Sequence, residues 1–372
     1  MEQKDYVKSL DGLRFFAVVL VLLDHWTNGK MGFPASYFGV SLFFVLSGFL
    51  ITGILLRAKT ADNLNNRDHS RSLKLFYIRR TLRIFPLYYL VLLVLYIQNE
   101  DFLRQHIFWL ITYQTNNYIA YTNTWMGSFD HFWSLAVEEQ FYLFFPFVIF
   151  FIRLNNIPRV LILLILSSVL LRYWFYFNHH SWVEPYVLMP TSLDALGLGG
   201  LLAYYLFNGK ATEMISNKYI KIGLLISLIS YCLLVIQMKS ISEPHNFYSV
   251  VLLRFFESLL SVFLIFSFVK IKDKSLFAIL KRAIFENKFV VFGGKISYGI
   301  YIYHHFIYNF YYSDNSNIIP QIFNKLNHYS LGFGDNIFVK LCILFPIVLI
   351  ISTISWYVFE NPINKLKDKY KY

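Results

Sequence analysis

Residues 10–26, LDGLRFFAVVLVLLDHW, form the first apolar segment of the chain and contain Arg14 and His25 eleven positions apart. Eleven helical steps of about 100° return the second residue to within about 20° of the first, with a rise of about 16 Å. The two side chains would share one helix face near opposite ends of a membrane span. An arginine near the bilayer centre costs at least about 2.5 kcal/mol, so such groups tend to mark a pathway or a reaction site. Alternatively, both residues only anchor the helix in the two headgroup layers.

The composition predicts an all-α, polytopic integral membrane protein. Apolar residues make up 56% of the 372 positions and charged residues only 15%, whereas a soluble protein is about a quarter charged. Apolar windows predict ten spans, near 10–27, 37–56, 84–98, 134–152, 159–177, 186–207, 219–238, 248–269, 296–313 and 337–359. The third is short and could begin near Phe76, with its arginines at the membrane interface. The piece 102–113 is expected to be interfacial or re-entrant, and 270–295 to be a cytoplasmic loop.

The distribution of basic residues predicts that both termini are cytoplasmic. Of the 34 Lys and Arg residues, 26 fall in the loops on one side of this layout and four on the other, an asymmetry typical of cytoplasmic loops. The chain is interpreted as one domain, 1–372, with a membrane core over 10–359 and a cytoplasmic tail over 360–372. Topology and anionic lipid account for the net charge of +12 without nucleic acid. Cys232 and Cys342 lie in apolar spans without metal-ligand spacing, so we predict no metal site.

Three arginines at the start of the third span predict a site for a polyanion. Arg79, Arg80 and Arg83 fall within about one helical turn and no lysine stands among them. The planar guanidinium donates two hydrogen bonds to phosphate at once, which lysine cannot do. The alternative is a basic cluster that only holds the cytoplasmic end of a span.

A polar stripe opens the fourth span. Ser134, Glu138 and Tyr142 recur at four-residue spacing, while Glu139 lies about 100° round the helix. On the predicted topology the two carboxylates share the outer leaflet with His25. One carboxylate could hold His25 in its reactive tautomer while the other binds a sugar hydroxyl.

The carboxylates of that stripe could instead form structural ion pairs with Arg172 or Arg254. Three further side chains within spans are candidates for substrate binding: Asp194, a lone acid in the sixth span, and Tyr298 and His304 in the ninth. His304 fits a structural hydrogen bond as well as it fits a place in the site.

Taken in order, these segments resemble the membrane-bound acyltransferase family three, bacterial membrane proteins that O-acylate cell-surface and exported glycans. The resemblance covers essentially the whole chain. The matching segments are Leu10-Asp-Gly-Leu-Arg14 with His25, the stretch GVSLFFVLSGFLIT over 39–52, Arg80-x-x-Arg83, Ser134-Leu-Ala-Val-Glu138-Glu139-Gln-Phe-Tyr142, Ser297-Tyr298 with His304, and Glu360-Asn-Pro362.

The resemblance implies a donor, an acceptor and roles for individual residues. Arg80 and Arg83 would contact the phosphates of cytoplasmic acyl-CoA, with acetyl-CoA the expected donor, and Arg14 would help to position it. His25 would be the essential catalytic residue, either as a general base or through a transient acyl-histidine. The acceptor would be a glycan or lipid-linked oligosaccharide of O-antigen, capsule or exopolysaccharide, and the protein would lie in the bacterial inner membrane. No permanently bound cofactor or metal is implied.

The chain departs from the family pattern at two positions. Ser192 stands where many members carry an arginine, and Asp24, beside His25, is expected to face elsewhere. No further domain is expected after the tenth span, so acyl transfer would finish in the membrane domain or depend on a separate partner. A transporter or flippase of lipid-linked glycan is the alternative function. Such a protein would not need an arginine cluster at the cytoplasmic end of a span in line with a histidine near the other end.

Overall fold

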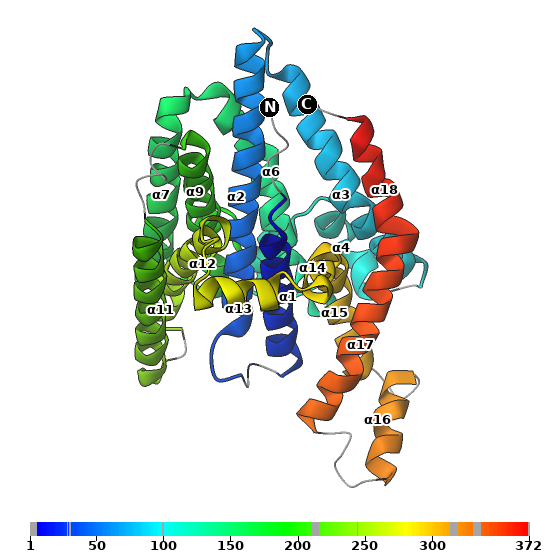
Figure 1. The fold of residues 1–372 in the computed structure, drawn as a ribbon. Coiled ribbons are helices and arrows are strands. Elements are labelled where there is room, and N and C mark those ends of the chain that lie inside the picture. The colour runs from blue at the N-terminus through cyan, green and yellow to red at the C-terminus, as the bar shows by residue number, and fades with distance from the viewer. Residues whose placement is uncertain are drawn as a thin grey trace.

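The computed structural model describes residues 6–27, 29, 31–98, 100–209, 216–243, 245–312, 318–329 and 336–370. Every regular element in these ranges is a helix, which confirms the all-α prediction. In Figure 1 the central helix α2 begins below the middle of the molecule and runs up to its top, and the red segment that follows α17 also reaches toward the top. The end of α2 that leads into α3 lies at this same end of the bundle.

Each of the ten predicted spans overlaps one long helix. These helices are α1 (Lys8–Trp26), α2 (Ala35–Leu64), α3 (Ser70–Ile97), α6 (Phe132–Phe151), α7 (Ile157–Phe177), α9 (Leu193–Asn208), α11 (Asn217–Ser240), α12 (Leu253–Lys270), α15 (Ser297–Tyr312) and α17 (Ile337–Ser355).

Seven helices are long and apolar enough to cross a membrane, so the chain is a multi-pass membrane protein. The three long helices outside that set are α1, α9 and α15. Helix α1 carries Asp11, Arg14 and Asp24, and α9 and α15 have 16 residues each, about 24 Å against a hydrocarbon core of about 30 Å. The count of ten spans and the side on which the termini lie stay predictions.

Shorter helices connect the long ones. They are α4 (Asp101–Ile111), α5 (Thr115–Thr122), α8 (Val183–Val187), α13 (Leu276–Phe285), α14 (Lys288–Lys295), α16 (Ile318–Tyr329) and α18 (Asn361–Lys365), with short turns η1 (Gly127–Phe129), η2 (Leu154–Asn156), η3 (Pro190–Ser192), η4 (Tyr248–Leu252), η5 (Trp356–Glu360) and η6 (Leu366–Lys369). The weakly apolar piece 102–113 is α4. The segment 270–295, expected to be a loop, contains α13 and α14, and α13 lies across the long helices (Figure 1).

Glycines let α2 and α9 approach at backbone distance. A Cβ on Gly48 would collide with the carbonyl of Leu196, and one on Gly199 would collide with the carbonyl of Val45. Small residues permit this approach between membrane helices, because dispersion contacts rather than hydrophobic burial hold them together in lipid.

Helix α3 begins earlier than predicted. It starts at Ser70, so its arginines lie inside the helix and not at its beginning. The polar first turn is held by the end of α2, where Asp62 accepts hydrogen bonds from Ser72 Oγ at 2.9 Å and His69 Nδ1 at 3.0 Å. Hydropathy alone misses this start because polar pairing, and not apolar burial, forms the first turn of α3.

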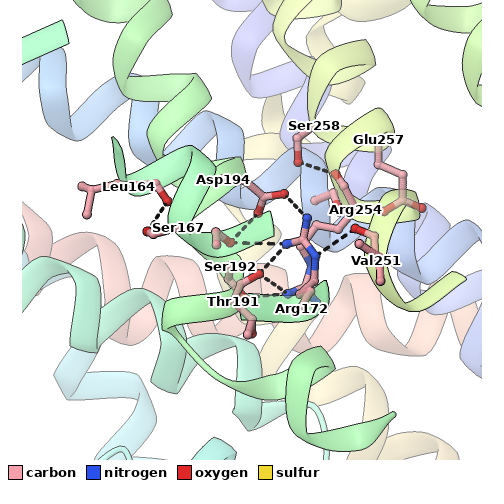
Figure 2. Close-up of polar contacts among 12 residues, drawn as sticks. Leu164, Ser167, Arg172, Thr191, Ser192, Asp194, Val251, Arg254, Glu257 and Ser258 are labelled. Atoms are coloured by element: carbon pink, nitrogen blue, oxygen red, sulfur yellow. Dashed lines mark hydrogen bonds and ion pairs between the residues drawn. The ribbon is translucent and has the colours of Figure 1, made fainter. Parts of the chain in front are cut away.

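A fully buried ion pair joins α7 to α9. Arg172 Nη2 lies 2.5 Å from Asp194 Oδ2, and the two residues are 1% and 0% exposed. Arg172 also donates to the carbonyls of Thr191 at 2.6 Å and Val251 at 3.1 Å (Figure 2). Because each charge is paired and hydrogen-bonded, the burial is tolerated, but loss of one partner would cost about 3–5 kcal/mol.

Arg254 of α12 holds the turn before α9. It donates to Ser192 Oγ at 2.7 Å and to the carbonyl of Tyr186 at 2.6 Å. The family pattern has an arginine at the position of Ser192. Here a guanidinium group reaches the same place from another helix, because Arg254 of α12 donates to Ser192. The alternative that Arg172 or Arg254 pairs with the carboxylates of α6 is wrong among the described residues, because Arg172 pairs with Asp194 instead.

Candidate active site

A cavity of about 210 Å³ lies between α1, α2, α3, α6 and α15. Seven of its lining residues were predicted site residues: Arg14, Arg80, Arg83, Ser134, Glu138, Tyr142 and Tyr298. The remaining lining is largely apolar and includes Val40, Phe43, Phe44, Leu50, Ile51, Ile54, Ile84 and Leu135, together with Ser47, Ser297 and Tyr301. A ligand that fills this cavity must combine an anionic part with a slender, mostly apolar part.

The arginines of the cavity are only partly neutralised. Arg14 pairs with Asp11 at 2.6 Å. Arg80 lies 4.0 Å from Glu138 and 3.9 Å from Glu139, and its buried Nε has no hydrogen-bond partner. Among the residues that the structure describes, the exposed Arg83 makes neither an ion pair nor a hydrogen bond. These guanidinium groups can therefore still bind an anion.

Arg79 does not join the other two arginines of α3. Its Nη1 donates to the carbonyl of Lys367 at 3.0 Å and to that of Tyr370 at 2.6 Å, in the segment that follows α17. Consecutive helical residues point about 100° apart, whereas Arg80 and Arg83 are three apart and share a face. The predicted trio is thus a pair at the cavity and a single arginine held elsewhere.

The carboxylates of α6 lie beside Arg80 and not beside His25. Ser47 Oγ donates a short hydrogen bond to Glu138, and the Arg80 guanidinium lies 3.7 Å from the ring centre of Tyr142. In the described part of the chain neither carboxylate contacts His25, so the predicted carboxylate–histidine contact is wrong. Arg80 of α3 therefore meets α6 at the level of Glu138 and Glu139.

Four histidines gather at the far end of α1. The ring centres of His25 lie 5.3 Å from those of His304 and His305, and His131 lies 5.0 Å from each of the latter two. His131 was not a predicted site residue; it directly precedes the first turn of α6 and is 2% exposed. No group of three or more metal-ligating side chains in the described ranges could hold a metal ion.

The hydrogen bonds of this cluster determine the tautomer of His25. His304 Nδ1 lies 2.6 Å from the carbonyl of Tyr301, which can only accept, so Nδ1 carries the proton. His304 Nε2 is then an acceptor, and His25 Nδ1 donates to it at 3.0 Å. With its proton on Nδ1, His25 retains a lone pair on Nε2. This assignment follows from the hydrogen-bond network.

Tyr301 separates the cavity from the histidines. It lines the cavity, and its ring centre lies 5.4 Å from His304 and 5.5 Å from His131. Its hydroxyl donates to the carbonyl of His131 at 2.7 Å and accepts from Ser134 Oγ at 2.6 Å. Tyr301 was not among the predicted site residues, although its three-residue spacing from Tyr298 and His304 places it on their face of α15.

Asp194 and Asp24, two acids singled out in the sequence, do not line the cavity. Asp194 was a predicted substrate-binding residue, but it does not line the cavity and its carboxylate faces Arg172. Asp24 accepts a hydrogen bond from the backbone N–H of Ser36 at 3.2 Å and another from its hydroxyl. The prediction that Asp24 faces away from His25 is confirmed.

Comparisons with known proteins agree with one another. A family model described as an acyltransferase domain matches residues 7–360. A provisionally named O-acetyltransferase of Staphylococcus aureus (strain COL) is 30% identical over 338 residues, which cover 83% of this chain and 52% of the relative. Peptidoglycan O-acetyltransferase OatA of Listeria monocytogenes is 34% identical over 189 residues, which cover 45% of this chain and 28% of the length of OatA. The chain spans about half the length of the first curated relatives it matches. No solved structure matches.

Proposed function

The chain belongs to the acyltransferase family whose model matches residues 7–360, and from this premise we propose that it moves an acyl group, acetyl first of all, from acyl-CoA to a hydroxyl of a cell-surface or exported glycan. That it is a membrane acyltransferase follows from the family and from the apolar helices. The finer proposal rests on one observation: the cavity has only partly neutralised arginines at one end and Tyr301, next to the histidine cluster, at the other.

The arginine end of the cavity suits the phosphates of coenzyme A. Arg83 is unpaired among the described residues, and the Nε of Arg80 has no hydrogen-bond partner. Phosphate contacts by guanidinium groups are charge-assisted and two-pronged, hence strong. We assign this end to the cytoplasm of a bacterial inner membrane, where acyl-CoA is made, and this agrees with the excess of basic residues in the loops on that side.

The apolar middle of the cavity suits the pantetheine arm and a small acyl group. Phe43, Phe44 and Leu135 line it, and Ser134 and Tyr301 form its far boundary. The acyl group would come to lie beside Tyr301, one ring away from His304.

His25 would supply the base. Its Nε2 takes the proton of the acceptor hydroxyl while the oxygen bonds to the thioester carbonyl carbon; the carbon–sulfur bond breaks, and the proton passes to the departing coenzyme A thiolate. A transient acyl-histidine would need the same unprotonated Nε2. In both cases His304 is a positioning residue, because its Nε2 accepts a hydrogen bond from the Nδ1–H of His25.

The decisive experiment compares surface polysaccharide from cells that lack the gene and from cells complemented with wild-type protein or with His25→Ala. Mass spectrometry should find an acyl increment with wild type and none with His25→Ala, at equal amounts of protein in the membrane. Wild-type acylation by an inserted His25→Ala protein would refute the assignment. A transporter or flippase would leave the glycan mass unchanged and would need no acyl-CoA.

A further inference from the structure

The segment that follows α17 packs against α3 next to the arginines of the cavity. It comprises α18 and η6, and Figure 1 shows α18 alongside α3. Arg79 ties the segment down with two hydrogen bonds to backbone carbonyls, one from Lys367 and one from Tyr370. An arginine that looks from sequence like a phosphate ligand is therefore used to place this segment.

The segment brings one more cation, Lys367, close to the arginines of the cavity, although Lys367 is not one of the lining residues. The Lys367 ammonium interacts electrostatically with Arg83, Arg79 and Arg80. In the part of the chain that the structure describes, the side chains of Lys367 and Arg83 make no ion pair and no hydrogen bond. The Coulomb interaction among these cations is repulsive.

The nearby carboxylates offset only part of this charge. Glu138 and Glu139 lie about 4 Å from Arg80. Glu360 interacts electrostatically with Arg83 but forms no ion pair with it in the described structure, and its side chain accepts a hydrogen bond from Ser355 Oγ at 3.0 Å. Asp368 is an exposed neighbour of Lys367 in sequence, and it too forms no ion pair among the described residues. Cations held together in this way at the cost of mutual repulsion are typical of a site whose ligand carries several negative charges.

Coenzyme A carries a diphosphate and a ribose 3′-phosphate, more charge than Arg80 and Arg83 can neutralise alone. We propose that Lys367 is an additional donor-binding residue that contacts a phosphate of coenzyme A, and that Arg79 is the positioning residue that holds Lys367 in place. This inference rests on the proposed use of acyl-CoA as donor.

The test is equilibrium binding of coenzyme A, and of S-acetylpantetheine, which lacks the phosphates, to the purified full chain in lipid nanodiscs. Lys367→Met should raise the Kd for coenzyme A about tenfold, which corresponds to about 1.4 kcal/mol. The Kd for S-acetylpantetheine should stay within twofold. Lys365→Met removes an exposed lysine from the same segment and is the matched control, with both affinities within twofold of wild type.

Arg79→Lys separates positioning from charge. It keeps the cation but loses the guanidinium group, whose Nη1 donates to both carbonyls, so we expect about the same tenfold loss as for Lys367→Met. Because the two residues act through one contact, the double variant should lose no more than either single variant. Wild-type affinity in Arg79→Lys, or additive losses in the double variant, would overturn the positioning role.

The result distinguishes this inference from the proposed function. If wild type binds coenzyme A and Arg83→Gln does not, while Lys367→Met binds like wild type, the inference fails and the donor assignment stands. If wild type does not bind coenzyme A, the donor assignment itself fails. An equal loss of S-acetylpantetheine binding in Lys367→Met would show a structural effect and would also overturn the inference.

Discussion

Replacing His304 by leucine should impair catalysis while leaving donor binding intact. The change removes the hydrogen-bond acceptor that His25 Nδ1 has at 3.0 Å in the described structure. A neutral hydrogen bond contributes about 0.5–1.5 kcal/mol net, so loss of tautomer control alone would lower the rate up to about tenfold. An imidazole free to rotate loses geometry as well. We expect kcat to fall about tenfold to a hundredfold, within the roughly 10²–10⁴-fold that a general base supplies.

The assay is steady-state acyl transfer by protein in proteoliposomes, with the acyl-CoA concentration varied. The KM for the donor should change less than twofold, because His304 does not line the cavity. His304→Gln is the control: its side-chain oxygen can accept from His25 Nδ1, so it should recover most of the rate. Equal rates for leucine and glutamine, or a leucine variant as fast as wild type, would refute the tautomer argument.

Three further outcomes test the site and the fold. Arg83→Gln should raise the donor KM about tenfold to a hundredfold in the same transfer assay, since a hydrogen bond to a charged group contributes about 1.5–3 kcal/mol; an unchanged KM would remove Arg83 from the donor site. Asp194→Asn should lower the free energy of unfolding by about 3–5 kcal/mol, because it leaves Arg172 unpaired. Thermal unfolding in detergent should show a lower midpoint. An unchanged midpoint would contradict a buried ion pair. Burial raises the pKa of Asp130, at the turn before α6, to about 7; because the folded state then binds more protons than the unfolded state between about pH 4 and pH 7, stability should fall as pH rises through that window. Asp130→Asn should make the free energy of unfolding less dependent on pH between pH 5 and pH 8. An equal pH dependence in the variant and the wild type would contradict the raised pKa of Asp130.

Tertiary contacts explain why several side chains depart from their predicted roles. Arg79, Arg80 and Arg83 look equivalent in sequence, yet Arg79 binds backbone carbonyls while the other two line the cavity. Asp194 is as suggestive as Glu138, yet Arg172 takes up its charge. The role of a side chain depends on which side chains of the neighbouring helix contact it, and a single sequence does not show which helices are neighbours.

The sequence by itself determined the all-helical architecture, the approximate positions of the long helices and most of the polar residues that line the cavity. Helical periodicity is a local property, so the shared face of Arg14 and His25 and the stripe from Ser134 to Tyr142 can be derived from spacing alone. In the structure Arg14 lines the cavity and His25 lies among the histidines, at the two separate levels of α1 that their spacing predicts.

Only the tertiary structure decided which faces meet and at what depth. It brought Glu138 to Arg80 instead of His25, and it added His131 and Tyr301 to the histidine end. The physical reason is that helix contacts in lipid depend on close backbone approach and on satisfying each buried polar group. Both conditions involve segments far apart in the chain, and neither appears in the periodicity of one helix.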